Sequence, residues 1–220
     1  MQLREAMDTL VSIEPDQIMA RLAQSRALFH SEADFQHAFA WELHRSAPDW
    51  DIRLEVPVRT STGAIYLDLL SRSPSAQVAL ELKYKTRALV TSINGEEFVL
   101  TNHVAQDIGR YDFFKDLSRV ETFAQADSGR SGYAILLTND SAYWKAPSTP
   151  AHGYAGFAMN DGRDVSGTLS WGDRASEGTR GREDGIVIRG RYFLRWRPYS
   201  SVAVNSYGDF RYLCVQAGAA

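Results

Sequence analysis

Two acidic residues and a lysine interrupt stretches of this sequence that are otherwise apolar. Asp68 lies within residues 64–70, AIYLDLL, and Glu81 and Lys83 lie within residues 77–84, QVALELKY. Both stretches have the length and composition of buried strands. Charged side chains are rare in buried strands unless they are paired or bind a ligand. These three residues therefore form the candidate site.

The spacing of the three charges allows them to meet if the two stretches pair as a hairpin. Side chains alternate between the faces of a strand, so Glu81 and Lys83 share one face. Asp68 can then lie opposite Glu81, with Cβ atoms roughly 5 Å apart. Two carboxylates this close repel each other unless a cation or a proton lies between them, and Mg²⁺ prefers oxygen ligands of this type. The alternative is a structural ion pair between Lys83 and one of the acids.

This arrangement resembles the active site of the PD-(D/E)XK nuclease superfamily, which has the restriction-endonuclease-like fold. The signature there is an Asp at the end of one strand, Glu-x-Lys on the next, and often a Glu on the preceding helix. Asp68, Glu81, Lys83 and Glu32 match it in order and spacing, although Leu67 stands where Pro is common. The resemblance covers about residues 28–140. It implies an α/β fold with an αβββαβ core, in which helices flank a mixed sheet.

The resemblance also implies hydrolysis of a phosphodiester with the help of Mg²⁺, or Mn²⁺. Asp68, Glu81 and the backbone carbonyl of Leu82 are expected to hold the metal ion. Lys83 is expected to orient the attacking water or to stabilise the developing negative charge. Glu32 would reach the ion directly or through water. DNA is the expected substrate, with RNA as the lesser alternative.

Glu32 has a structural alternative and a competitor. A carboxylate in the first turn of a helix is favoured by the helix dipole even when it is fully solvated. Glu42 on the same predicted helix is the competing candidate for the site.

Four further residues are candidates for contacts with the substrate. Gln106 and Arg110 are four residues apart on a predicted helix and share a face, and Tyr111 follows. Many superfamily members carry a Gln and a Tyr or Arg there, near the phosphate. The match is partial, because the common spacing would put the tyrosine at position 110; an exposed helix face is the alternative. Lys85 shares a strand face with Lys83 and is a candidate for phosphate contact.

The elements that must position these residues follow from the periodicity of the apolar residues. The first 30 residues are predicted to be helical, with Leu3, Met7, Leu10 and Val11 on one face. A second helix is predicted from Ser31 to before Pro48, with Ser31 and Asp34 approximating a capping box. Three strands over 52–59, 64–70 and 77–84 are predicted to form an antiparallel meander. A helix over 103–123 and a strand over 132–137 follow, and the helical crossover favours a parallel partner for that strand.

The last third of the chain differs in composition. Gly, Ser, Asp and Arg dominate residues 147–185, which are predicted to be mostly irregular. Short strands over 185–189, 192–197 and 210–215 are expected to pack on or extend the core sheet. Residues 1–220 are thus predicted to be a single domain, divided into N-terminal helices (1–30), a nuclease-like core (31–140) and a loop-rich extension with short strands (141–220).

The charge of the chain does not favour nucleic-acid binding, since the net charge is −3 and the pI is about 6.0. We therefore keep a second hypothesis, a non-catalytic accessory or nucleic-acid-binding module with the nuclease fold. The charge is nevertheless uneven, because seven arginines gather late in the chain and are a candidate DNA-contacting face: Arg174, Arg180, Arg182, Arg189, Arg191, Arg195 and Arg197.

Other function classes lack their sequence signals. The five histidines are scattered and Cys214 is the only cysteine, so a zinc site is disfavoured. The glycine motifs of serine hydrolases, P-loop proteins and dinucleotide-binding proteins are missing. No apolar run is long enough to cross a bilayer, which predicts no membrane partner, and the single cysteine favours a cytoplasmic location. A homodimer is expected if both DNA strands are cut.

Overall fold

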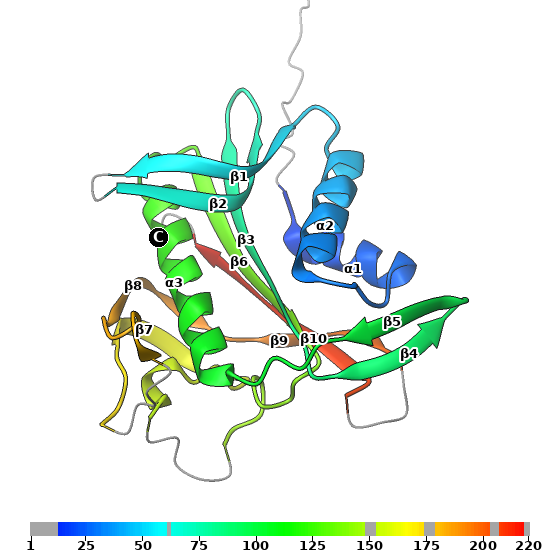
Figure 1. Ribbon diagram of the computed structural model, residues 1–220. Helices are drawn as coiled ribbons and strands as arrows, with labels where there is room; N and C mark the ends of the chain where they lie inside the picture. The colour runs from blue at the N-terminus through cyan, green and yellow to red at the C-terminus, as the bar shows by residue number, and fades with distance from the viewer. Residues whose placement is uncertain (1–12, 61–62, 148–152, 174–178, 203–206, 218–220) are drawn as a thin grey trace, which may run out of the picture.

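The protein is built around a six-stranded mixed sheet (Figure 1). The computed structural model describes residues 13–60, 63–147, 153–173, 179–202 and 207–217. The sheet order is β1-β2-β3-β6-β10-β9. Its strands are β1 (Asp51–Thr60), β2 (Gly63–Arg72), β3 (Gln77–Lys85), β6 (Arg130–Thr138), β9 (Trp196–Ser201) and β10 (Asp209–Ala217). The predicted α/β class, with a mixed sheet flanked by helices, is confirmed.

The strand directions in the central part of the sheet agree with the sequence prediction. β1, β2 and β3 form an antiparallel meander, and β3 pairs with β6 in parallel, from Gln77 beside Arg130 to Lys85 beside Thr138. Helix α3 (Gln106–Ala124) is the crossover between these two parallel strands. The predicted C-terminal strand over 210–215 is also confirmed, since β10 extends the sheet beside β6 and β9 follows it.

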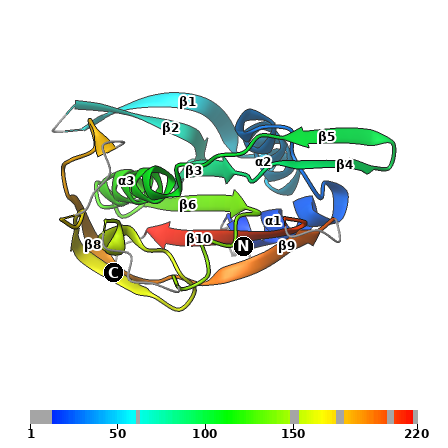
Figure 2. The same ribbon diagram turned by 60° about the horizontal axis from the view of Figure 1, so that its bottom comes forward.

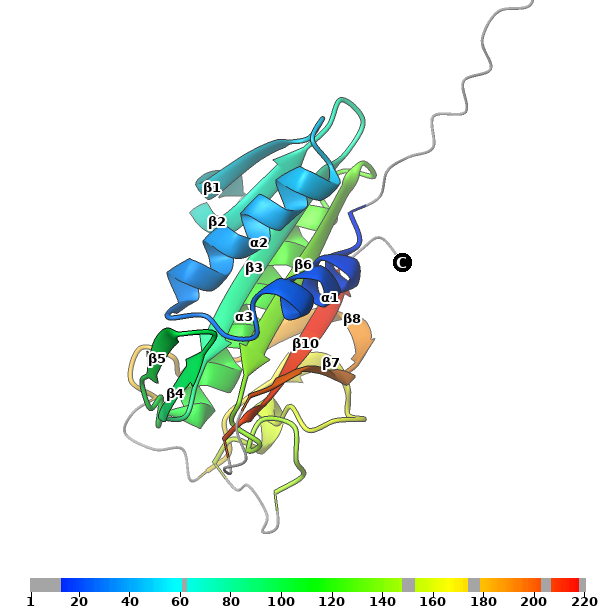
Figure 3. The same cartoon turned by 90° about the vertical axis from the view of Figure 1, so that its right-hand side faces the viewer.

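Helices cover both faces of the sheet. Figure 3 shows α1 (Pro15–Ser25) and α2 (Glu32–Ser46) on the near side of the sheet and α3 behind it. Leu80, Leu82 and Tyr84 of β3 pack in the core on the α1–α2 side, whereas Ala79 packs in the core on the α3 side. The alternation along β3 therefore turns the odd-numbered residues, including Glu81 and Lys83, toward α3.

Helix α2 begins and ends as its sequence predicts. Ser31 is the N-cap, and its Oγ accepts a hydrogen bond of 3.1 Å from the backbone N–H of Asp34. Phe35, Phe39 and Leu43 form its buried stripe. The helical face predicted for residues 3–11 lies outside the described residues, as does Arg174.

A separate hairpin lies between β3 and α3. Strands β4 (Leu89–Ile93) and β5 (Glu96–Leu100) pair with each other and project from the body of the molecule (Figure 2). Asn94 and Gly95 at the turn both have positive φ, 52° and 84°, as a two-residue hairpin turn with a right-handed twist requires. None of the helices that the structure describes is long and apolar enough to cross a membrane.

In the C-terminal extension, the prediction of a mostly irregular region holds with an exception, and one predicted strand was wrong. Part of the region predicted to be irregular forms β7 (Asp164–Leu169), which pairs with β8 (Ile186–Phe193), and η1 (Ala155–Phe157) is a short 3-10 helix. The strand predicted over 192–197 is two strands, because the chain leaves the small β7–β8 sheet and enters the main sheet there. Trp196 marks the change: its backbone N–H donates to Asp161 Oδ1 and its indole donates to the Met159 carbonyl.

Candidate active site

The site begins where β2 separates from β3. The pairing between the two strands ends at Leu69 and Leu80, although β2 continues to Gly63 in its pairing with β1. Continuing the β2–β3 register by one residue puts Asp68 opposite Glu81, as the hairpin hypothesis predicted. Beyond this point β3 keeps β6 on one side, and no strand within the described ranges pairs with it on the other.

Side chains take the place of the missing strand along this edge of β3. Asp68 Oδ2 accepts a hydrogen bond of 2.7 Å from the Leu82 amide, and Glu32 Oε2 accepts one of 2.8 Å from the Tyr84 amide. Between them, Gln36 Nε2 donates to the Leu82 carbonyl at 3.4 Å. Successive amides on one edge are two residues apart, so the two carboxylates bind about 7 Å from each other. The structure thus brings Asp68, Glu32 and the Leu82 carbonyl to a single edge.

The face of β3 next to this edge carries a cluster of charges, formed with helix α3. Lys83 Nζ lies 3.1 Å from Asp116 Oδ2 and 3.9 Å from Asp68 Oδ2. Arg119 Nη1 lies 2.8 Å from Asp116 Oδ1 and 3.9 Å from Glu81 Oε1. We refer to Asp68, Glu81, Lys83, Asp116 and Arg119 as the charged cluster.

Burial perturbs the protonation of this cluster. Glu81 is only 2% exposed, and burial, with Asp116 and Asp68 adding to it, raises the pKa of its carboxyl strongly. Burial likewise raises the pKa of Asp116, although Lys83 and Arg119 oppose the shift. For Lys83, burial lowers the pKa, but Asp116, Asp68 and Glu32 together more than offset it, so the ammonium group stays charged.

The charged cluster is chemically suited to a hard divalent cation but does not form a finished metal site. It contains three carboxylates and two cationic groups, and Glu81 Oε1 is buried with no hydrogen-bond partner among the described residues. Carboxylate oxygens of this kind are Mg²⁺ ligands, so an ion would supply the missing partner. No group of three or more acid, His or Cys side chains in the described ranges is already arranged to hold a metal.

The candidate substrate residues of α3 lie elsewhere. Gln106 Nε2 donates to Asp140 Oδ2 at 3.0 Å. Arg110 is 4% exposed, and its guanidinium donates to the Ala142 carbonyl and lies over the rings of Tyr143 and Tyr154. The first turns of α3 are thus covered by the chain that follows β6, and the structure does not bring Gln106 or Arg110 into the charged cluster.

Tyr111 is also turned toward the C-terminal extension. Its ring stacks on Trp171 with centroids 5.6 Å apart, and its hydroxyl donates to the Asp184 carbonyl at 3.3 Å. Tyr111 therefore neither lies on an exposed helix face nor contacts the charged cluster. Tyr111 instead packs in the core between α3 and the extension.

Lys85 and the competing acid of α2 have separate partners. Lys85 Nζ lies 3.7 Å from Glu32 Oε2, and both residues line a pocket of about 240 Å³. Glu42 forms ion pairs with Arg21 and Arg45 instead. Of the two candidate acids on α2, Glu32 is the one that contacts β3.

Sequence reasoning missed Asp116 and Arg119. The signal was present in the helical stripe of α3, in which Phe113, Leu117 and Val120 are fully buried. An acid at position 116 falls inside that buried arc. A charge inside the apolar face of a helix is as informative as one inside a strand.

Comparison with known proteins adds no assignment. No family model matches the chain, and no curated protein and no solved structure shows significant similarity to it. A function for this chain has to be inferred from the geometry of the charged cluster itself.

Proposed function

We propose that the charged cluster is the active site of a Mg²⁺-dependent or Mn²⁺-dependent nuclease that hydrolyses phosphodiester bonds of DNA. The observation that carries the proposal is that β2 leaves β3 immediately before Asp68 and Glu81, with Lys83 Nζ 3.9 Å from Asp68 Oδ2. The element order α2, β1–β3, α3, β6 and the parallel β3–β6 pair support a restriction-endonuclease-like core.

In this proposal Asp68, Glu81 and the Leu82 carbonyl hold the ion, and Glu32 on the same edge reaches it through water. The bound ion would supply polarisation of the phosphate and a lowered pKa for a coordinated water. The oxygen of the attacking water bonds to phosphorus while the bond to the leaving oxygen breaks. The water gives up a proton to solvent, and the leaving oxygen takes one from solvent.

Lys83 supplies the fixed positive charge. Its ammonium stays protonated because Asp116 and Asp68 lie beside it, so it serves by orienting the water or stabilising charge on the phosphate, not as a base. Asp116 and Arg119 are positioning residues, since they contact Lys83 and Glu81 from α3. The low exposure of the cluster strengthens each of these interactions.

The test is cleavage of plasmid and linear DNA by Asp68→Asn and Lys83→Met. Each substitution should reduce Mg²⁺-dependent cleavage by about 100-fold to 1,000-fold without unfolding the protein. Lys115→Met is the matched control, because Lys115 is an exposed lysine on α3 next to Asp116. Undiminished cleavage by both cluster variants would rule the mechanism out.

Two details of this proposal have their own measurements. DNA and RNA of the same sequence, incubated side by side, establish which polymer is cut. Cutting both strands of a duplex calls for a homodimer, which sedimentation and the ratio of nicked to linear plasmid product test together.

The second candidate is a non-catalytic accessory or nucleic-acid-binding module. The lack of a ready-made metal group among the described residues favours it, as does the net charge of −3. Calorimetry separates the two functions. The nuclease should bind Mn²⁺ or Mg²⁺ and lose that binding in Glu81→Ala, whereas a protein that binds neither ion fits the accessory module.

A further inference from the structure

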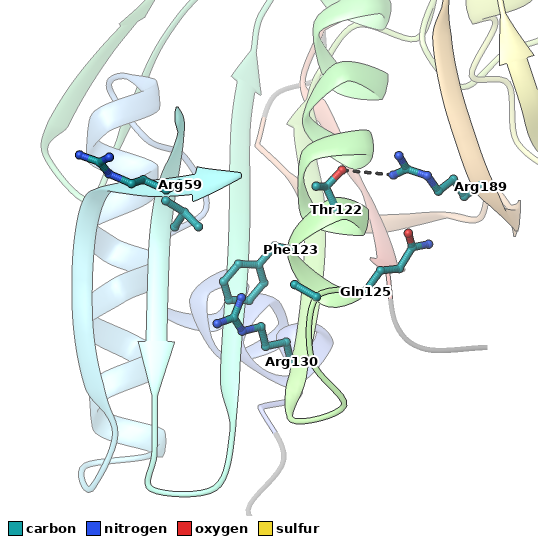
Figure 4. Close-up of a pocket in the computed structure, with 8 residues that line it drawn as sticks. Arg59, Thr122, Phe123, Gln125, Arg130 and Arg189 are labelled. Atoms are coloured by element: carbon teal, nitrogen blue, oxygen red, sulfur yellow. Dashed lines mark hydrogen bonds between the residues drawn. The ribbon is translucent and has the colours of Figure 1, made fainter. Parts of the chain in front are cut away.

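A cavity of about 410 Å³ lies beside the C-terminal turns of α3, away from the residues of the charged cluster. Arg59 of β1, Arg130 at the start of β6 and Arg189 of β8 line it with Thr122 and Phe123 of α3. Figure 4 shows Arg130 beside Phe123 and Arg189 beside Thr122, whereas the guanidinium of Arg59 is directed away from the other two. No acidic residue is among those that line it. Three cationic residues from three separate strands therefore line one cavity.

These three arginines differ from most others in the protein. Ten arginines of the described ranges form ion pairs with carboxylates. Arg59, Arg130 and Arg189 form none with a described carboxylate. In a chain of net charge −3, three guanidinium groups without a carboxylate partner create a local positive potential that attracts anions.

The neighbours of the three arginines hold two of them in place without neutralising them. The Arg130 guanidinium lies over the Phe123 ring, 5.0 Å from its centroid. Arg189 Nη1 donates to Thr122 Oγ1 at 3.2 Å. Both contacts fix a side chain while leaving further N–H donors of its fork available.

A buried carboxylate fixes the strand that carries Arg189. Glu121 is 2% exposed, and its carboxylate accepts from the backbone amides of Arg189 and Gly190, at 3.2 and 2.8 Å, and from the Tyr192 hydroxyl at 2.7 Å. This anchor holds β8 against α3. A preorganised arginine loses less conformational entropy when it binds an anion.

We propose that this cavity is a phosphate-binding subsite for the nucleic-acid backbone. Guanidinium forks match phosphate oxygens in a bidentate manner, and the lining offers three of them with no competing carboxylate. We refer to Arg59, Arg130 and Arg189 as the arginine pocket. Its role as a subsite of the substrate rests on the proposed nuclease function, whereas its binding of nucleic acid does not.

The separation between the arginine pocket and the charged cluster allows one nucleic-acid strand to contact both. Thr122 follows Asp116 by six residues on α3, about 9 Å along the helix axis. Arg130 pairs with Gln77, four residues before Glu81 on β3 and about 13 Å along the strand. One strand of a duplex advances about 3.4 Å per nucleotide. The pocket would thus take a phosphate roughly three or four nucleotides from the bond that is cut.

The experiment measures binding apart from cleavage. Arg59→Gln, Arg130→Gln and Arg189→Gln are combined in an Asp68→Asn background, and a short labelled duplex is titrated in EDTA at several salt concentrations. Loss of the three phosphate contacts should weaken binding by about 10-fold to 100-fold and reduce the slope of log K against log salt by about 2 to 3. Arg191→Gln is the matched control, because Arg191 lies on the same strand but pairs with Asp164.

The outcomes separate the subsite from the nuclease proposal. A triple variant that melts normally and binds like the Arg191→Gln control overturns the subsite, whatever happens to cleavage. Inorganic phosphate that binds the protein as tightly as the duplex does also overturns it, since the pocket would then be a small-anion site. Loss of duplex binding in the triple variant supports the subsite even if Asp68→Asn fails to reduce cleavage, an outcome that contradicts the nuclease alone.

If cleavage is present, ethylation interference locates the protected phosphate. Interference roughly three or four nucleotides from the cut should disappear in the triple variant and persist in Arg191→Gln. Interference that is unchanged in the triple variant contradicts the subsite.

Discussion

The acidic residues around β3 fall into two groups that the protein satisfies differently. On the edge left by β2, Asp68 and Glu32 each accept a backbone N–H of β3. On the face toward α3, Asp116 is matched by cations, but Glu81 Oε1 is buried without a hydrogen-bond partner among the described residues. The same chemical group is thus stabilised at the edge and destabilised on the face.

The difference separates acids that already have a structural role in the sheet from an acid that has none. An acid that accepts a backbone amide replaces a neighbouring strand, and it would be retained with or without a ligand. A buried carboxylate with a strongly raised pKa lowers stability, and such groups concentrate at functional sites. Glu81 is therefore the residue that argues most directly for a bound cation.

The largest expected effect is that of Asp116→Ala. This substitution leaves Lys83 buried without the carboxylate that lies 3.1 Å away, and breaking a buried pair in this way costs about 3–5 kcal/mol. Urea unfolding of the variant measures the cost. Asp164→Ala is the control, because its pair with Arg191 is exposed and should contribute less than about 1 kcal/mol. Equal losses in the two variants would contradict the description of the cluster.

Adding Mg²⁺ should have the next largest effect. An ion that binds only the folded protein stabilises it by about 2.7 kcal/mol at a concentration of 100 times its dissociation constant. Thermal melts with Mg²⁺ and with EDTA should therefore differ for the unmodified protein and coincide for Glu81→Gln. A shift of the same size in both proteins would mean that the ion binds elsewhere.

Glu81→Gln should raise stability in EDTA at neutral pH, by about 1–2 kcal/mol. The folded pKa of Glu81 is above its unfolded value, so the folded state favours the protonated carboxyl. The contribution of Glu81 to the free energy of unfolding is then fully present below the ordinary carboxyl pKa, and it is lost as the pH rises above that value. The gain in stability from Glu81→Gln should accordingly be large at neutral pH and vanish at about pH 4. A gain that does not depend on pH would exclude ionisation of Glu81 as the cause.

Much of this arrangement was predictable because it depends on local patterns. The alternation in β3 and the charges at positions 68, 81 and 83 predicted the hairpin, the register and the shared face of Glu81 and Lys83. The cap at Ser31 predicted the start of α2, and hence the point at which Glu32 is presented to β3. Each of these inferences needs only neighbours along the chain or across one turn.

The rest depends on contacts that only the folded chain establishes. Arg110 and Tyr111 are held by Tyr143, Tyr154 and Trp171, which belong to a region too poor in apolar residues for its packing to be predicted. The stripe of α3 marks Asp116 as a charge on a buried face, but its contact with Lys83 follows only from the packing of α3 on β3. The arginine pocket likewise joins three strands that are far apart in the sequence.

The smallest expected effect is that of Glu32→Gln, which allows a direct comparison of the edge acid with Glu81 on the face. Glu32→Gln keeps an oxygen that can accept from the Tyr84 amide but removes the charge that strengthens this hydrogen bond and attracts Lys85 at 3.7 Å. Charge-assisted hydrogen bonds are stronger than neutral ones, so the variant should lose about 0.5–1 kcal/mol at neutral pH. Urea unfolding in EDTA compares it directly with Glu81→Gln. The same exchange of Glu for Gln should destabilise the protein at the edge of β3 and stabilise it on the face. The reason is that Glu32 Oε2 accepts a hydrogen bond, whereas Glu81 Oε1 accepts none from the described residues. If both variants shift in the same direction, the two groups of acids are not distinct and the case for a cation at Glu81 loses its physical basis.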